Sequence, residues 1–330
     1  MNYGRLIQYF TGYYWSLQKE KKFIQQHFGQ FLRQKTAELN YTFSKSDWKK
    51  TTVYYPCFTV LAGAENFILL KGSRKLNEQE RYRLTAVSIM SGLCDDLIDE
   101  ESWTPAQLFN LLDNRLESLP LSPKAKLILA LNDQLYKTSR PNAAYEKQLR
   151  TAIYWQARSL EQLHPEISTE EILQISKEKN GQTSLMFSYL LDEEWNSIEK
   201  SIIAQSGFLG QLVNDTYDVF KDVKAGVQTY LQRYESLDAS EDFFIDEWRK
   251  LVRLIHESNA TKKNKRHLIN RFACVHGYAL VAFHQFRRIE QNRGKPVKWN
   301  EATRKELVVD MEKWPTRWQL LKAIKKLSTL

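Results

Sequence analysis

The sequence predicts an all-α protein, on three observations. Glycine (12) and proline (8), the residues that cost most inside a helix, are scarce among the 330 residues. Apolar side chains recur at three- and four-residue steps over long stretches. The long alternating runs of β-branched residues that mark half-buried strands are missing. Because no repeat or linker-like segment divides the chain, we expect residues 1–330 to form one helical domain.

The helices are expected in the following order. The first covers 3–36, and after a polar connection at 41–50 a buried helix covers 51–70, entered through a turn at Pro56. The next ends at Asp99, with apolar residues on one face. Thr104–Pro105 and Ser122–Pro123 each place a capping side chain before a proline at the first helical position. Beyond Asp99, amphipathic segments are expected at 105–117, 123–138, 142–163, 168–191, 241–258, 262–292 and 300–328.

Charge and composition exclude several classes of function. The net charge of +9 is spread along the chain, and only Lys262–Arg266 is a dense basic cluster, so nucleic-acid binding ranks last. The three cysteines are far apart and fit no disulfide or metal-binding spacing. No signal peptide and no run approaching the ~20 apolar residues of a membrane span is recognised. We expect a cytosolic protein, and the sequence leaves its oligomeric state open, a homodimer included.

The first acidic motif follows an apolar helical run and places five carboxylates within residues 95–101. Asp95 and Asp99 are four residues apart, so both project from one side of the helix end. Asp96 lies about 100° around the helix from Asp95. Acids at a helix end are common, so this motif alone is weak evidence for a site.

The second acidic motif covers residues 211–222 and carries Asn214, Asp218 and Asp222 at steps of four. On an α-helix this spacing gives one axial stripe of oxygen ligands, with neighbours ~6 Å apart. Asp215 flanks the stripe. Gly207 and Gly210, just upstream, are expected to let a neighbouring helix or a substrate approach closely.

The two motifs together predict a magnesium site. Ionised carboxylates beside apolar positions are unfavourable unless they are paired or bound to a cation. Mg²⁺ prefers carboxylate and amide oxygens together with water and phosphate. We therefore expect the two motifs to form two walls of one site for magnesium and a diphosphate. The expected metal ligands are Asp95, Asp96, Asp99, Asn214, Asp218 and Asp222.

These motifs resemble those of the class I isoprenoid enzymes, the superfamily of terpene cyclases, trans-prenyl diphosphate synthases, and squalene and phytoene synthases. Residues 95–99 match its aspartate-rich DDxxD motif. Residues 214–222 resemble the Asn–Asp motif of terpene cyclases. Asn214, Asp215 and Lys221 match that motif, whereas Asp218 replaces its hydroxyl residue and Asp222 its glutamate. The stretch is also similar to the second motif of prenyl synthases, with Gln211 in the glutamine position.

The resemblance implies a helical bundle around a deep apolar cavity, with three magnesium ions at its mouth and an allylic prenyl diphosphate as substrate. It implies catalytic roles for residues of both motifs, namely Asp95, Asp99, Asn214, Asp218 and Asp222. Lys221 and Lys224 lie beside the second motif, and Arg317–Trp318 resembles the Arg–Tyr pair of cyclases. Lys221, Lys224 and Arg317 are therefore expected to bind the diphosphate. Lys177, Lys179 and Arg233 are further candidates.

A terpene cyclase is the favoured reaction type. Chain-elongating synthases need a second diphosphate pocket, which an arginine pair after the first motif and a lysine before a threonine usually supply. Here Glu100 and Glu101 follow Asp99, and Gln182 takes the lysine position. The basic turn at residues 71–75 lies too close to the first motif to match. Chain elongation, head-to-head condensation of the squalene or phytoene type, and a non-catalytic helical partner stay open as alternatives.

Overall fold

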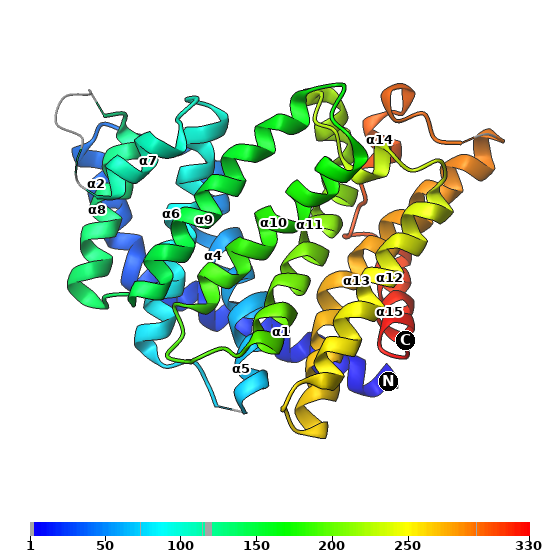
Figure 1. The fold of residues 1–330 in the computed structure, drawn as a ribbon, viewed down its shortest axis with the longest axis horizontal. Coiled ribbons are helices and arrows are strands. Elements are labelled where there is room, and N and C mark those ends of the chain that lie inside the picture. The colour runs from blue at the N-terminus through cyan, green and yellow to red at the C-terminus, as the bar shows by residue number, and fades with distance from the viewer. Residues whose placement is uncertain (1–2, 73, 114, 116–120, 295) are drawn as a thin grey trace. The chain divides into compact units, whose positions relative to one another are not determined.

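The protein is all-α, as predicted. The computed structural model describes residues 3–72, 74–113, 115, 121–294 and 296–330. In these residues the chain consists of helices joined by turns and loops and contains no strand (Figure 1). Contacts divide it into two compact units, and the single-domain arrangement stays a prediction. Unit 1 comprises Met1–Gln8, Arg158–Ser184 and Trp195–Leu330, and unit 2 comprises Tyr9–Ala157 and Leu185–Glu194.

Unit 2 contains two long helical runs that include π-helical turns. The first joins α1 (Tyr3–Ile24), whose first residues belong to unit 1, through η1 (Gln25–Gly29) to α2 (Gln30–Glu38), which confirms the helix predicted at 3–36. The second consists of α3 (Lys45–Lys49), η2 (Lys50–Tyr54), α4 (Tyr55–Phe58), η3 (Thr59–Ala64) and α5 (Glu65–Lys71). The remaining helices are α6 (Glu78–Asp99), α7 (Pro105–Leu112), α8 (Pro123–Thr138) and α9 (Ala143–Arg158).

The turn predicted at Pro56 is wrong. Pro56 lies inside the second run, which begins at Lys45 after Ser44, whose side chain caps the helix by accepting from the Asp47 amide. In an α-helix a proline ring clashes with the carbonyl four residues earlier. The π turn η2, which comes directly before α4, widens the helix at this point and relieves that clash. The polar connection predicted at 41–50 is therefore shorter than expected.

In unit 1 the helices after the first acidic motif follow the predicted order. They are η4 (Ser159–Leu163), α10 (Thr169–Ser188, its last turn in unit 2), α11 (Ser197–Ala225), η5 (Tyr230–Gln232), α12 (Leu237–Glu257), α13 (Lys262–Arg293), η6 (Trp299–Glu301), α14 (Arg304–Leu307) and α15 (Trp314–Leu327). The core includes Trp248, Phe244 and Phe283, all fully buried. The indole N–H of Trp248 donates to the Leu327 carbonyl at 3.1 Å, so α15 is fixed to α12.

Two predicted helices differ from the observed ones. The helix predicted at 300–328 is broken, because Val308 and Val309 leave the helical conformation and Pro315, which has no N–H, starts a new helix, α15. The helix predicted at 105–117 is observed as α7, which ends at Leu112. Residues 114, 116 and 117 of that prediction lie outside the described residues.

One helical run in the described chain, Lys45–Lys71, is long and apolar enough to cross a membrane by length and composition. Its most apolar window has a mean hydropathy of 1.3, and 61% of that window is buried inside the protein. A core helix meets the same criterion, so this run is weak evidence for a span. The expectation that the chain lacks a membrane span stays a prediction.

A buried carboxylate in unit 2 predicts a pH dependence of stability. Burial raises the pKa of Glu20 from 4.5 to about 7, although Arg81 lies 3.2 Å away and partly offsets the shift. The folded state therefore binds this proton more tightly than the unfolded state does. Stability from this group is complete below pH 4.5 and is lost as the pH rises through about 7. We expect Glu20→Gln to be more stable than the wild type at pH 8, by up to about 3 kcal/mol, and similar at pH 5.

Urea unfolding at the two pH values measures this difference. Glu257→Gln, which changes an exposed glutamate at the end of α12, is the matched control and should leave the pH dependence unchanged. Parallel pH profiles for Glu20→Gln and the wild type would contradict the prediction.

Candidate functional site

The first acidic motif lies at the C-terminal end of α6, as its apolar periodicity predicts. The helix starts with a capping box between Asn77 and Glu80 and stays helical through Asp99. Asp95 is half-buried and its Oδ2 accepts a hydrogen bond from the Tyr55 hydroxyl at 3.1 Å. Asp99 is exposed. The motif therefore offers one carboxylate in a partly enclosed position and another in solvent.

Asp96 differs from the other two aspartates because lysines surround it. The Nζ of Lys50 lies 2.7 Å from Asp96 Oδ1, and the Nζ of Lys124 lies 3.6 Å from Asp96 Oδ2. Lys124 also forms an ion pair with Glu100. Burial lowers the pKa of Lys50, but the hydrogen bond to Asp96 and the charges of Asp95 and Glu100 outweigh it, so the pKa is raised. The negative charge of this predicted metal ligand is thus already compensated by the protein.

The sequence did not identify Lys50, Tyr55 or Lys124 as site residues. Lys50 and Tyr55 are five residues apart and would lie about 140° apart on an α-helix. In η2 the Tyr55 amide donates to the Lys50 carbonyl, the i to i+5 bond of a π turn. This turn brings both side chains to one side, with Lys50 Nζ 5.6 Å from the centroid of the Tyr55 ring. Pro56 is the one local signal that indicated irregular helix geometry here.

The second acidic motif lies within α11, which is continuous from Ser197 to Ala225. Asn214, Asp218 and Asp222 therefore occupy successive turns of one helix, the arrangement that their spacing predicts. Asn214 is exposed, whereas Asp218 and Asp222 are half-buried. Asp215, which we placed beside the stripe, is buried, with a relative exposure of 2%.

Burial, and to a smaller extent neighbouring acids, shift the pKa values of two carboxylates of the second motif. Burial raises the pKa of Asp215 to about 7, in spite of a 2.7 Å hydrogen bond from Gln211, and the charges of Asp222 and Asp218 raise it further. Burial and the charge of Asp218 raise the pKa of Asp222 to about 7. Asp215 Oδ2 is buried and has no hydrogen-bond partner among the described residues. Ionising the carboxylates of the second motif is therefore costly, because the bases near them do not offset burial and the neighbouring acids.

Lys179 on α10 supplies part of the missing positive charge. Its charge lowers the pKa of both Asp215 and Asp222, and its Nζ lies 3.2 Å from the Ser159 hydroxyl. Two glycines let α10 and α11 approach closely enough for this interaction. A Cβ at Gly207 would lie 2.3 Å from the Asn180 carbonyl oxygen, and one at Gly181 would lie 3.3 Å from the Ala204 carbonyl oxygen.

No neighbouring helix approaches Gly210, and the approach of a substrate there stays a prediction. A Cβ at this position would have no other described atom within 4 Å, apart from the helix's own backbone and its chain neighbours. Gly207 alone of the two predicted glycines allows a neighbouring helix to approach.

The predicted diphosphate-binding residues have different environments. Lys221 is exposed, and its charge lowers the pKa of Asp222, so it lies close to that carboxylate of the second motif. Lys224 is exposed, with its Nζ 5.9 Å from the centroid of the Phe220 ring. The Nε of Arg317 donates to the Met311 carbonyl at 3.1 Å, and the sulfur of Met311 accepts from the Tyr217 hydroxyl of α11 at 3.3 Å. Arg317 is thus connected to the second motif through Met311.

The weaker candidates are placed less favourably. Arg233 donates from Nη2 to the Pro165 carbonyl at 2.9 Å. Lys177 is exposed, and its role in diphosphate binding stays a prediction.

The acidic residues of the second motif are suited to a cation that also binds a phosphate ligand. In the described ranges, no group of three or more His, Cys, Asp or Glu side chains is arranged to enclose a metal ion. Mg²⁺ does not require such a cage, since it is commonly bound by one or two carboxylates, substrate phosphates and water. A buried carboxylate oxygen without a partner, next to Asp218 and Asp222, is a position that a bound cation would stabilise. Asp218 and Asp222 are the residues that would hold it.

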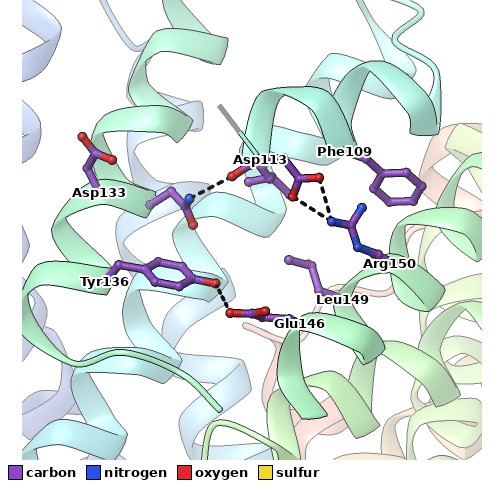
Figure 2. A pocket seen from close by; sticks show the side chains of 9 residues that line it. Phe109, Asp113, Asp133, Tyr136, Glu146, Leu149 and Arg150 are labelled. Atoms are coloured by element: carbon purple, nitrogen blue, oxygen red, sulfur yellow. Dashed lines mark hydrogen bonds and ion pairs between the residues drawn. The ribbon is translucent and has the colours of Figure 1, made fainter. Parts of the chain in front are cut away.

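Unit 2 also contains a polar cavity of about 280 Å³ among α7, α8 and α9 (Figure 2). The guanidinium of Arg150 donates to both carboxylate oxygens of Asp113, at 2.7 and 2.9 Å. The Tyr136 hydroxyl donates to Glu146 at 3.0 Å. These groups pair with one another across the cavity, so none of them indicates a ligand. This cavity is not the deep apolar one that the family resemblance implies, which stays a prediction.

Comparison with known families and with curated proteins finds no family model and no protein that matches this chain. The two acidic motifs belong to different compact units. We therefore infer the function from the sequence and from the geometry of each motif by itself.

Proposed function

We propose that the protein is a magnesium-dependent class I terpene synthase. It ionises an allylic prenyl diphosphate, and the resulting carbocation cyclises or is quenched. The observation that carries this proposal is a group of carboxylates on α11 that is costly to ionise: burial, with the charges of neighbouring acids, raises the pKa of Asp215 and Asp222, and one buried oxygen of Asp215 has no partner among the described residues. Such an arrangement is costly unless it binds cations. The sequence resemblance of both motifs supplies the reaction class.

The proposed reaction breaks the C–O bond between the allylic carbon and the diphosphate, and the electron pair leaves with the diphosphate. The carbocation then either loses a proton to the released diphosphate or to water, or adds water and loses one of that water's protons to form an alcohol. Magnesium, when bound, supplies Lewis-acid stabilisation of the departing negative charge. We propose that Asp95, Asp99, Asn214, Asp218 and Asp222 bind the metal ions, and that Lys221 and Arg317 attract the diphosphate. The positive charge of Lys179 offsets part of the repulsion between Asp215 and Asp222.

Chain elongation is disfavoured by the partners of the residues that would bind a second diphosphate. Arg74, in the basic turn, donates to Glu80 at 2.7 Å and to Glu193 at 2.6 Å, so its charge is already paired. Gln182, in the position of the elongators' lysine, donates to Glu178 at 2.6 Å. Arg74 and Gln182 therefore offer a second diphosphate little uncompensated positive charge. These contacts support a single-substrate reaction.

Incubation of the purified protein with magnesium and allylic diphosphates of increasing chain length tests the proposal. We expect diphosphate release and an apolar product from one substrate, with or without isopentenyl diphosphate. The EDTA-treated protein is the control and should release no diphosphate. Full activity in EDTA would refute the metal assignment, and radiolabel from isopentenyl diphosphate in a longer diphosphate would identify a prenyl diphosphate synthase instead.

A further inference from the structure

The outer face of α15 carries two exposed tryptophans. Trp314 is 75% exposed and Trp318 is 42% exposed. The opposite face of the helix packs into unit 1 through buried apolar side chains, namely Leu320, Ala323, Ile324 and Leu327. Tryptophan is highly buried on average in folded proteins. Two indole rings in solvent on successive turns of one helix therefore indicate a surface that contacts something other than water.

The tryptophans share this face with two exposed lysines, Lys322 and Lys325. At 100° per residue, positions 314, 318, 322 and 325 lie within about 80° of one another around the helix. Along the helix axis they extend over ~16 Å. A flat partner that lies against the outer face of α15 can therefore contact all four side chains at once.

The surface around this face has an excess of positive charge. α15 contains four basic residues and no acidic one. Lys326 pairs with Glu241 of α12 at 2.9 Å. Of the described carboxylates, none forms an ion pair with Lys322 or with Arg288 of α13. Burial and the charges of Arg288 and Lys322 lower the pKa of His284, also on α13. The neighbouring acids therefore leave part of this positive charge uncompensated.

We propose that the outer face of α15 binds the surface of an anionic lipid bilayer. The rings of Trp314 and Trp318 lie among the headgroups, and Lys322 and Lys325 contact lipid phosphates. Tryptophan is favoured at membrane interfaces because its ring is apolar and its N–H is polar. Lysines next to an anionic leaflet are attracted to it, and their apolar stems reach along the surface. Exposed aromatic rings and uncompensated lysines on one face fit this partner.

A nucleic acid fits the same face less well. The phosphates of a duplex would attract the lysines but leave both indole rings in water. A single strand would stack its bases on the rings, but proteins that bind single strands hold them in a basic groove. The outer face of a helix is convex. Both features of the α15 face are therefore used together only by a lipid surface.

Sedimentation of the purified full chain with vesicles tests this inference. We expect binding to vesicles of phosphatidylcholine and phosphatidylserine that weakens as the salt concentration rises, and weaker binding to phosphatidylcholine alone. Replacing both Trp314 and Trp318 with alanine should lower the partition coefficient tenfold or more. Lys322→Ala and Lys325→Ala should each lower it about fivefold on the anionic vesicles.

Two variants are matched controls. Trp15→Ala removes a tryptophan of α1 that is 63% exposed, and Lys126→Ala removes an exposed lysine of α8. Both should bind vesicles like the wild type. Because the substituted side chains are exposed, every variant should keep the unfolding temperature of the wild type.

Quenching by brominated phosphatidylcholine locates the rings. Mixed with phosphatidylserine in the vesicles, it should quench part of the tryptophan fluorescence of the wild type. The variant that lacks Trp314 and Trp318 should lose that quenching. Quenching that persists in this variant would overturn the assignment to α15.

The inference goes beyond the proposed function and is tested without substrate, so failure of either leaves the other standing. A wild type that does not sediment with anionic vesicles would overturn it. Equal vesicle binding by the wild type and the double tryptophan variant would also overturn it. Binding of a single-stranded oligonucleotide that these substitutions abolish, without vesicle binding, would assign the face to nucleic acid instead.

Discussion

Replacing Asp218 with asparagine is expected to lower turnover of an allylic diphosphate about 100-fold or more. The substitution preserves shape and removes one negative charge from the centre of the α11 stripe. Asp218 is half-buried and close enough to Asp222 and Asp215 to raise the pKa of both. Removing one preorganised electrostatic contact to a developing charge typically costs 10²–10³ in rate. Steady-state diphosphate release measures the effect.

The stability of this variant gives a second readout. Because the carboxylates of α11 repel one another, Asp218→Asn should be at least as stable as the wild type in thermal unfolding. Asp242→Asn, which changes an exposed aspartate of α12 in the same unit, is the matched control and should keep wild-type turnover. Wild-type turnover in Asp218→Asn would remove this residue from the proposed site. Loss of activity together with unfolding would indicate a structural role instead.

Gly207→Ala is expected to destabilise the packing of α10 against α11. The added Cβ would lie 2.3 Å from the Asn180 carbonyl oxygen and 2.4 Å from the Ser184 hydroxyl, so α10 must move away from α11. Forcing an extra methyl group into a close-packed contact costs about 1–3 kcal/mol, and a backbone carbonyl cannot rotate away as a flexible side chain can. Urea unfolding measures the loss.

Gly210→Ala is the matched control on the same helix. It has free space for a Cβ among the described atoms, and alanine is a better helix former than glycine by about 0.5–1 kcal/mol. We therefore expect Gly210→Ala to raise stability while Gly207→Ala lowers it. Equal effects of the two substitutions would contradict the close contact at Gly207. The movement of α10 away from α11 in Gly207→Ala should also draw Lys179 away from Asp215 and Asp222.

Much of the secondary structure could be predicted from the sequence, because helices depend on local properties. The apolar period predicted α6 up to Asp99, and the Ser122–Pro123 start predicted α8 at its observed bounds. The four-residue spacing within 214–222 likewise predicted a stripe on one helix, and α11 runs unbroken through it. Scarcity of glycine and proline, helical apolar spacing and the lack of alternating β-branched runs together predicted the all-α class.

The prediction failed where backbone geometry departs from the regular helix. Pro56 indicated a turn by itself, but the chain absorbs this proline in a helix through a π turn. The segment at 300–328 is amphipathic enough for one helix, yet it breaks before Pro315. In both places the outcome depends on how the rest of the unit packs, which a local pattern does not contain.

The sequence by itself determined the helical class, the order of the helices and the two acidic motifs as candidate ligands. Tertiary structure alone decided how each carboxylate is compensated. Lys50 and Lys124 neutralise Asp96 from segments 46 and 28 residues away in the chain, whereas Asp215 is buried with one oxygen that has no described partner. The physical reason is that the electrostatic free energy of an ionised group depends on burial and on charges within a few ångströms, which folding brings together from distant parts of the sequence.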